Sequence, residues 1–254
     1  MLVTVDIGNS RLKAGLWQGA SLLQHVAQDY RREAPDLPAQ LRRFLAEPLF
    51  CQSHERMLVA CVAGETVERA LLQAAANLSP VAFFRTSAQC CGIRHAYAQP
   101  AQHGVDRWAA LIGARKLSEG ALCVIDVGTA VTVDLLSADD CHLGGRIMPG
   151  LNMMKTALQQ GTAKLTDTGG NSSLFADNTA DAIGAGVFHM LRTALDAVID
   201  EAQAHPSLAG DDNMRVFLTG GQAAMLQAVL RQADAIRLEP ALVLHGLQRV
   251  AEQT

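Results

Sequence analysis

The chain has 254 residues, 49% of them hydrophobic, and a formal net charge of −4 at pH 7. This length suits one large domain or two smaller ones, and the acidic balance gives no support to nucleic acid as a partner. The sequence holds no run of 18 apolar residues, and its N-terminus has no basic segment ahead of an apolar one. We therefore predict neither a transmembrane helix nor a signal peptide, and no membrane partner.

The first half of the chain opens with a predicted β-hairpin. "LVTVD" is followed by the turn "IGNS", and Leu12, Ala14 and Leu16 then alternate with other residues at the period of a half-buried strand. "RMLVACVA" is apolar throughout, which is typical of a central strand buried on both faces. After the hairpin we predict strands at 21–27, 56–63 and 80–84, helices at 36–50, 65–78 and 105–120, and a loop at 96–104.

The second half opens with another hairpin, at Leu122. Beyond it we predict strands at 141–150 and 214–221, the latter ending in a glycine pair, helices at 151–161, 179–204 and 222–232, and a turn-rich stretch at 162–178. Each half thus has antiparallel strands first and then strands alternating with helices, which is an α/β architecture. We expect two related lobes, residues 1–117 and 118–254, that face each other across a cleft.

The cysteines and histidines do not form a recognisable metal or disulfide pattern. The sequence has six cysteines and eight histidines but no C-x-x-C and no H-E-x-x-H. Cys90 and Cys91 are neighbours, whereas Cys61 and Cys123 lie inside apolar runs and are expected in the core. We infer a reducing compartment and expect the protein in the cytoplasm.

The two hairpins repeat one motif 120 residues apart, with Asp6, Gly8 and Asn9 matched by Asp126, Gly128 and Thr129. A single D-x-G is typical of a turn that ends a strand. A matched second copy favours function, because two carboxylates can hold hydrated Mg²⁺ against a polyphosphate.

The residues around these acids also suit phosphate. Small residues let backbone N–H groups approach phosphate oxygens, and Lys13 can add a positive charge. G-x-x-x-x-G-K-[ST] and G-x-G-x-x-G are both absent, which argues against a P-loop kinase and a Rossmann dehydrogenase.

Three motifs, "DIGNSRLK", "DVGTAVTVD" and "LTGG", resemble the phosphate and adenosine motifs of the actin, sugar kinase and Hsp70 superfamily. Within it, "HGVDRWAALIGA", "GGRIMPGLNMM", "NTADAIGAG" and "LVLHGL" resemble type III pantothenate kinase. These blocks run from residue 3 to 247, and their order is highly specific. One departure is Thr166, in "TAKLT", where the family pattern has proline.

The resemblance implies a duplicated ribonuclease-H-like fold, as in actin-like ATPases, with two lobes and a cleft. It also implies ATP-dependent phosphorylation of pantothenate to 4'-phosphopantothenate, the first step toward coenzyme A. A homodimer, Mg²⁺ and a monovalent cation, K⁺ or NH₄⁺, belong to the same expectation.

The resemblance further assigns the acceptor site. Asp106 would be the general base for the pantothenate hydroxyl, although an Asp at a helix start is commonly an N-cap. Thr179 would line the pocket, although it too could be a cap. Trp108 is expected in the core. The substrate-binding set is Tyr97, Gly104, Val105, Asp106, Arg107 and Thr179, with the Arg107 guanidinium suited to the pantothenate carboxylate.

The nucleotide and ion sites follow from the same resemblance. Asp126 would bind the monovalent cation, and Asp6 would hold Mg²⁺ through water. Gly220 and Gly221 could be a plain strand–helix turn, but they suit close approach of adenosine. Asp134 could be only a polar strand residue. The expected ATP-binding residues are Asp6, Ile7, Gly8, Asn9, Ser10, Arg11, Leu12, Lys13, Thr129, Gly220 and Gly221.

Two other functions stay open at this point. One is another small-molecule kinase of the superfamily, which would share the phosphate motifs without "GVDRWAALIGA" or "NTADAI". The other is a non-catalytic regulatory accessory protein. The presence of Asp6, Lys13, Asp106, Asp126 and Thr129 argues against an inactive site.

Overall fold

The computed structural model describes residues 1–162, 175–208 and 214–253. They fold into two compact units, each with its own five-stranded sheet. The first unit comprises Met1–Glu119, Asp139–Leu143 and Ala241–Thr254, and the second comprises Gly120–Ala138 and Gly144–Pro240. The two lobes predicted from the sequence repeat, residues 1–117 and 118–254, are halves of the duplication, and the boundary between them stays a prediction.

The sheet of the first unit has the strand order β3-β2-β1-β4-β5. Its strands are β1 (Leu2–Ile7), β2 (Arg11–Gln18), β3 (Ser21–Asp29), β4 (Arg56–Cys61) and β5 (Val81–Phe83). β1, β2 and β3 form an antiparallel meander, while β4 and β5 add parallel to β1. The predicted hairpin, the third strand and the buried central strand β4 are confirmed.

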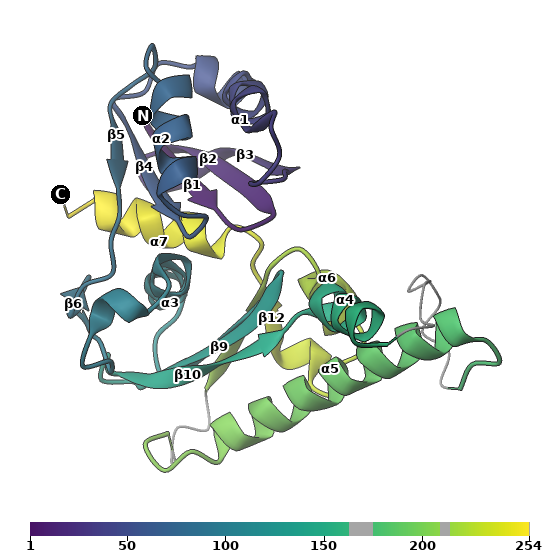
Figure 1. The fold of residues 1–254 in the computed structure, drawn as a ribbon. Helices are drawn as coiled ribbons and strands as arrows, with labels where there is room; N and C mark the ends of the chain where they lie inside the picture. The colour runs from purple at the N-terminus through teal and green to yellow at the C-terminus, as the bar shows by residue number, and fades with distance from the viewer. Residues whose placement is uncertain (163–174, 209–213, 254) are drawn as a thin grey trace. The chain divides into compact units, whose positions relative to one another are not determined.

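Alternation along β1 gives the sheet two different faces. Val3, Val5 and Ile7 pack with α1 (Leu37–Leu45) and α2 (Glu65–Ala74) on one face. On the other face Thr4 accepts a 2.7 Å hydrogen bond from the Trp17 indole, and Trp17 packs against α7 (Leu242–Ala251). Figure 1 shows α1 and α2 on one side of this sheet and α7 on the other. Because side chains alternate, Asp6 belongs to the Thr4 face.

Helix α7 packs closely against α3 (Val105–Leu117), and two glycines make this possible. A Cβ atom at Gly113 would lie 2.2 Å from the Leu242 carbonyl oxygen, and one at Gly246 would lie 1.8 Å from that of Ala109. These separations are far below van der Waals contact, so only glycine allows the two backbones to approach this closely. Glycines from the "GVDRWAALIGA" and "LVLHGL" motifs therefore have a packing role.

The second unit repeats the strand order of the first, as β10-β9-β8-β11-β12. Its strands are β8 (Leu122–Val127), β9 (Ala130–Leu136), β10 (His142–Pro149), β11 (Arg215–Thr219) and β12 (Ile236–Leu238). β8 and β9 are antiparallel, and β11 and β12 add parallel to β8. The hairpin followed by parallel strands therefore occurs in both units, as the repeated motif predicts.

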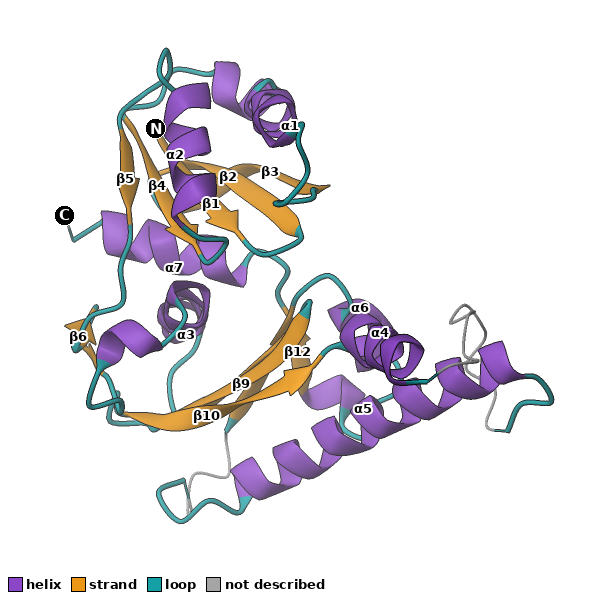
Figure 2. Cartoon of the chain, in the orientation of Figure 1, coloured by secondary structure: helices purple, strands orange, loops and turns teal. Residues whose placement is uncertain are grey.

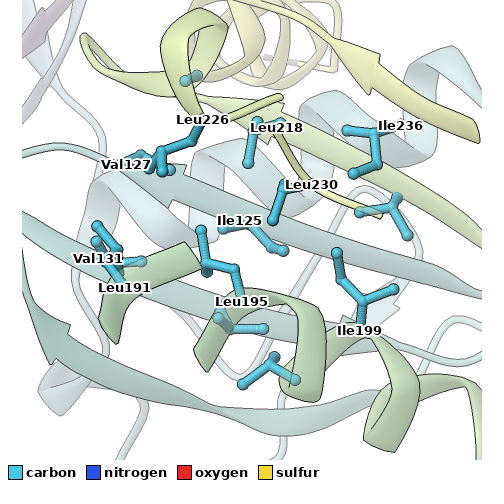
Figure 3. Close-up of a cluster of buried hydrophobic side chains, with 14 of the residues drawn as sticks. Ile125, Val127, Val131, Leu191, Leu195, Ile199, Leu218, Leu226, Leu230 and Ile236 are labelled. Atoms are coloured by element: carbon cyan, nitrogen blue, oxygen red, sulfur yellow. The ribbon is translucent and has the colours of Figure 1, made fainter. Parts of the chain in front are cut away.

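Helix α5 (Thr179–Gln203) covers the core of the second unit. Leu191, Leu195 and Ile199 lie one turn apart and point toward Ile125 and its neighbours on the sheet (Figure 3). By length and composition alone α5 could cross a membrane. Its buried stripe instead makes it the core helix of this unit. The same core also includes Leu218, Leu226, Leu230 and Ile236.

Several predicted elements need correction, and Figure 2 shows their observed extent. The helix predicted at 36–50 ends at Leu45, and a 3-10 turn at Pro48–Cys51 follows, because a residue before proline disfavours the helical region. The helix predicted at 222–232 is only α6 (Ala223–Gln227). Three features were not predicted from the sequence: α7, β12 and the short hairpin of β6 (Gln89–Cys90) and β7 (Ile93–Arg94). Helix α4 (Leu151–Gly161) is confirmed.

Two sequence predictions concern residues 163–174. The turn-rich stretch predicted at 162–178 lies mostly outside the described residues, and Thr166 lies wholly outside them.

All six cysteines are described, and they are free, as predicted.

Candidate active site

The first hairpin places Asp6 and Lys13 side by side. They are register partners on β1 and β2, and Nζ of Lys13 lies 3.5 Å from Oδ2 of Asp6. Both side chains are largely buried, with 12% of Lys13 and 8% of Asp6 exposed. Low exposure strengthens the attraction between the two charges. An acid and a lysine therefore lie together at the end of β1, where the sequence predicts a phosphate site.

Residues after β3 hold the turn between β1 and β2. The Tyr30 hydroxyl donates a 2.7 Å hydrogen bond to the Gly8 carbonyl, and Tyr30 N–H donates to the Ser10 carbonyl at 3.0 Å. Burial raises the pKa of Tyr30, so its hydroxyl remains a neutral donor. Arg32 donates to the Asn9 side chain at 2.5 Å. The side chains of Asn9 and Ser10 are exposed, so the tip of the turn is open to a ligand.

The second hairpin brings Asp126 against the glycine pair that follows β11. Gly220 has φ +100°, a conformation that favours glycine. A Cβ atom there would lie 2.5 Å from both Oδ1 of Asp126 and the Val127 carbonyl oxygen. The Gln222 N–H donates to that carbonyl at 3.1 Å. Gly220 thus needs to be glycine for two reasons, its positive φ and its close approach to Asp126.

The two hairpin turns differ in length. Ile7 pairs with Leu12 around residues 8–11, whereas Val127 pairs with Val131 around residues 128–130. Asp126 consequently faces Thr132 where Asp6 faces Lys13. The sequence repeat continues through the acid and the glycine, but the lysine belongs to the first copy alone.

Asp106 lies in the first turn of α3, and its N-cap interpretation is wrong. The N-cap is Gly104, with φ −54° and ψ 130°. Oδ1 of Asp106 accepts a 2.8 Å hydrogen bond from the N–H of Arg107, and a Cβ atom on Gly104 would lie 2.6 Å from that oxygen. Gly104 therefore leaves room for the carboxylate, which is half-buried, while Arg107 is only 7% exposed.

Thr179 begins α5, but it is not the cap. Asn178 is the N-cap, and its side chain accepts a 3.0 Å hydrogen bond from the N–H of Asp181. Thr179 itself is exposed, so its hydroxyl is accessible. Trp108 is fully buried, which confirms its expected place in the core, and Asp134 is 2% exposed on β9.

Sequence reasoning missed a group of histidines around Tyr97. The ring of Tyr97 lies 5.0 Å from that of His95, 5.1 Å from that of His103 and 5.8 Å from that of His142. The three histidines have no regular spacing in the sequence. One signal was present: His95 directly precedes the segment predicted as a loop at 96–104, and His103 lies near the end of that segment.

Each unit contains part of the predicted site. Within the first unit lie Asp6–Lys13, Tyr97 and Gly104–Arg107, and within the second lie Asp126, Thr129, Thr179, Gly220 and Gly221. The structure brings Asp6 to Lys13 and Gly220 to Asp126. The roles of these residues in binding and catalysis stay predictions.

A family model described as type III pantothenate kinase matches residues 2–201. The type III pantothenate kinase of Halorhodospira halophila is 36% identical over 97% of this chain and 96% of its own length. That of Stenotrophomonas maltophilia strain K279a is 38% identical over 97% of this chain and 95% of its own. Both relatives match across nearly their whole length.

Solved structures show the same fold at low identity. A Campylobacter jejuni protein assigned to the Baf family of transcriptional activators has a TM-score of 0.58 at 20% identity, covering 99% of this chain and 98% of its own. MreB5 of Spiroplasma citri bound to ADP has a TM-score of 0.52 at 12% identity, covering 99% and 96%. The expected actin-like, duplicated α/β fold is confirmed.

Proposed function

Because the chain belongs to the type III pantothenate kinase family, we propose that it transfers the γ-phosphoryl group of ATP to the 4'-hydroxyl of pantothenate. The product, 4'-phosphopantothenate, is the first intermediate toward coenzyme A. The observation that carries this proposal is the match over nearly the full length of relatives named for this activity. The local geometry supports it separately for the nucleotide, the ions and the acceptor.

The nucleotide phosphates would bind at the turn after β1. Asn9 and Ser10 are exposed there, and Lys13 supplies a positive charge beside Asp6. Asp6 would hold Mg²⁺ through water, since Mg²⁺ keeps several waters and binds by one or two carboxylates plus phosphates. When bound, Mg²⁺ neutralises charge that develops on the phosphates. The remaining expected ATP contacts are Ile7, Gly8, Arg11, Leu12, Thr129, Gly220 and Gly221.

The monovalent cation, K⁺ or NH₄⁺, would bind at Asp126. The donors present there fit such an ion, because Oδ1 of Asp126 and the Val127 carbonyl oxygen both border the position that a Cβ atom of Gly220 would occupy. Hard cations take oxygen ligands of this kind. When bound, the cation supplies positive charge to the phosphate region.

The acceptor would bind at Tyr97 and at residues 104–107, with Thr179 also in the pocket. Asp106 would accept the proton of the pantothenate hydroxyl, and its place in the first turn of α3 favours the ionised carboxylate. A weak base suffices, because phosphoryl transfer relies mainly on positioning and charge neutralisation. The Arg107 guanidinium would pair with the pantothenate carboxylate.

We also propose a homodimer and a cytoplasmic location. The dimer follows from the resemblance to the family. The location is supported by six free cysteines, which suit a reducing compartment. A non-catalytic regulatory role is the second candidate. One solved neighbour is assigned to a family of transcriptional activators, but at 20% identity it supports a shared fold and no shared role.

The deciding experiment measures ADP release with and without pantothenate at several K⁺ concentrations, with Mg²⁺ present. We expect release to depend on pantothenate and to rise with K⁺. Pantothenate-independent release with activity on a sugar would favour another kinase of the superfamily. Absence of release under all conditions would favour the regulatory role.

A further inference from the structure

Three histidines of the first unit surround one point beside Tyr97. The ring centroids of His95 and His103 are 4.8 Å apart, those of His95 and His142 are also 4.8 Å apart, and those of His103 and His142 are 5.0 Å apart. His103 and His142 are 2% and 3% exposed, while His95 is half-buried. The indole of Trp108 lies 4.7 Å from the His95 ring. His95 thus contacts every other ring of the group.

The hydrogen bonds of His95 determine which of its nitrogens carries the proton. The backbone N–H of Tyr97 donates to Nδ1 of His95 at 2.8 Å, so that nitrogen must be an acceptor. A neutral imidazole has one acceptor and one donor, which places the proton on Nε2. Nε2 lies 2.9 Å from Nδ1 of His103 and therefore donates to it.

This assignment argues against a metal ion held by all three rings. Three centroids at nearly equal separations would suit imidazoles that converge on one ion. A ligating nitrogen must offer its lone pair, however, and in neutral His95 the Nδ1 lone pair accepts from Tyr97 while Nε2 is protonated. The geometry instead describes a directed chain of hydrogen bonds from Tyr97 through His95 to His103.

The chain joins the two ends of the predicted acceptor segment. Tyr97 is at its start, and His103 immediately precedes Gly104 and the α3 turn that carries Asp106 and Arg107. The His103 backbone is itself held, because its carbonyl accepts from the Thr86 hydroxyl at 2.9 Å. His95 therefore holds the Tyr97 backbone by a hydrogen bond, contacts the Tyr97 ring at its edge, and bonds the residue that leads into α3.

We propose that His95 is a positioning residue for the acceptor: through Nδ1 it fixes Tyr97, and through Nε2–H it ties Tyr97 to the segment that leads into α3. The proposal rests on the proposed function, since it takes Tyr97 and residues 104–107 as the pantothenate contacts. His95 itself need not touch the substrate. Its removal should weaken pantothenate binding and leave ATP binding unchanged.

Three variants separate the two hydrogen bonds. His95→Phe keeps a ring and removes both nitrogens. His95→Asn places an amide oxygen near the Nδ1 position, where it can still accept from Tyr97 N–H. His95→Gln places its amide near the Nε2 position, where it can still donate to His103. His245→Phe is the matched control, because His245 lies on α7, where its ring packs edge-on against Trp17 with 5.0 Å between the ring centroids.

The kinetic experiment measures KM for pantothenate and for ATP separately. We expect His95→Phe, which loses both hydrogen bonds, to raise KM for pantothenate by about 10- to 100-fold. His95→Asn and His95→Gln each keep one of the two bonds, so their pantothenate KM should lie between those of wild type and His95→Phe. KM for ATP should stay within about twofold in all three variants. An unchanged pantothenate KM in His95→Phe, or a KM in both His95→Asn and His95→Gln as high as in His95→Phe, would overturn the proposal.

A measurement without substrate keeps the inference apart from the proposed function. In ¹⁵N spectra of the histidine side chains, the signals absent from His95→Phe identify His95. We expect them to show a neutral ring protonated at Nε2 near pH 8. A ring protonated at Nδ1 would overturn the proposal. A wild-type protein without pantothenate-dependent turnover would instead overturn the proposed function, and the spectra would still test the hydrogen-bond chain.

Discussion

Nζ of Lys13 lies 3.5 Å from Oδ2 of Asp6, across neighbouring strands, with both side chains mostly shielded from solvent. This ion pair holds the lysine beside the acid that we expect to hold hydrated Mg²⁺. This arrangement reduces the reorganisation needed when phosphate binds.

Replacing the lysine tests this arrangement. Lys13→Met retains most of the stem but loses the charge, and we expect kcat/KM for ATP to fall by about 100-fold, the order that loss of one preorganised charge produces. Steady-state kinetics with saturating pantothenate measure this. Lys155→Met on α4 is the control and should leave kcat/KM unchanged. Equal activity of the two variants would show that Lys13 has no part in nucleotide binding.

Gly220 should tolerate no side chain. Gly220→Ala places a methyl group about where the Asp126 carboxylate lies, in a backbone conformation with φ +100°. We expect a loss of about 1–3 kcal/mol in the free energy of unfolding from backbone strain. If the cation binds at Asp126, the K⁺ concentration for half-maximal activity should also rise, which a K⁺ titration measures. Gly128→Ala is the milder comparison, since its Cβ would lie 3.4 Å from the same carboxylate oxygen.

Replacing glycine by alanine should have opposite effects at Gly246, in the contact between α3 and α7, and at Gly186, on α5. Gly246→Ala would place Cβ 1.8 Å from the Ala109 carbonyl oxygen, so the helices must move apart. We expect destabilisation of about 3 kcal/mol or more, as for severe overpacking. A Cβ at Gly186, on α5, meets no atom within 4 Å, and Gly186→Ala should stabilise by about 0.5–1 kcal/mol. Urea unfolding compares the two, and similar effects would contradict the packing argument.

Local pattern predicted the hairpins and most helices, because the signal lies within each segment. Alternation in "RLKAGLW" indicated β2, and the apolar run at 56–63 indicated β4. Strand order was less accessible, since it depends on contacts between distant residues. Helix α6 shows the limit: Ala, Leu and Gln favour a helix to residue 232, but the Gln227 side chain donates to the Ile236 carbonyl at 2.8 Å, and the chain turns toward β12 instead.

The site was predictable to the extent that single residues mark it. Asp6, Asp126 and Gly220 stand out in the sequence, and the structure gives each a local reason. The hydrogen bonds from Tyr30 to Gly8 and from Arg32 to Asn9 could not be predicted from the sequence, because the partners are 22 and 23 residues apart. The histidine group was missed because its members come together only when the chain folds.

Cys90 should be the most reactive thiol. Its Sγ lies 3.8 Å from that of Cys91, at a turn where Cys91 has φ +53°. The side-chain hydrogen bond with Cys91 lowers the pKa of Cys90 to about 7, whereas burial raises the pKa of Cys123 to about 12. The thiolate is the form that reacts, and its fraction grows as the pH rises through the pKa of the thiol. Iodoacetamide labelling of Cys90 should therefore be half-maximal in rate near pH 7.

Mass spectrometry of labelled peptides checks this rate site by site. In Cys91→Ser the donor thiol is replaced by a hydroxyl, so the pH profile of Cys90 should shift only modestly. In Cys91→Ala the donor is gone, and the profile should move to higher pH. Faster labelling of Cys123 than of Cys90 at pH 7 would contradict the prediction.

Asp106→Asn tests the proposed base most directly. Asn keeps an oxygen that can accept the N–H of Arg107, and Gly104 remains the N-cap, so α3 should fold as before. The lost first-turn charge is worth only about 0.3–1 kcal/mol. A positioned base contributes about 10²–10⁴-fold, equivalent to roughly 3–5.5 kcal/mol of barrier. We therefore expect a Tm near that of wild type, retained ATP binding and a kcat lower by that factor.

The control for this change is Glu65→Gln, which removes an exposed first-turn charge from α2 without touching the acceptor segment. It should leave kcat unchanged, which would separate the loss of a helix charge from the loss of a base. Near-normal turnover in Asp106→Asn would restrict Asp106 to a structural part in α3. The base would then be sought at Asp126, which is half-buried, before Asp134, which is 2% exposed and so less accessible to an acceptor.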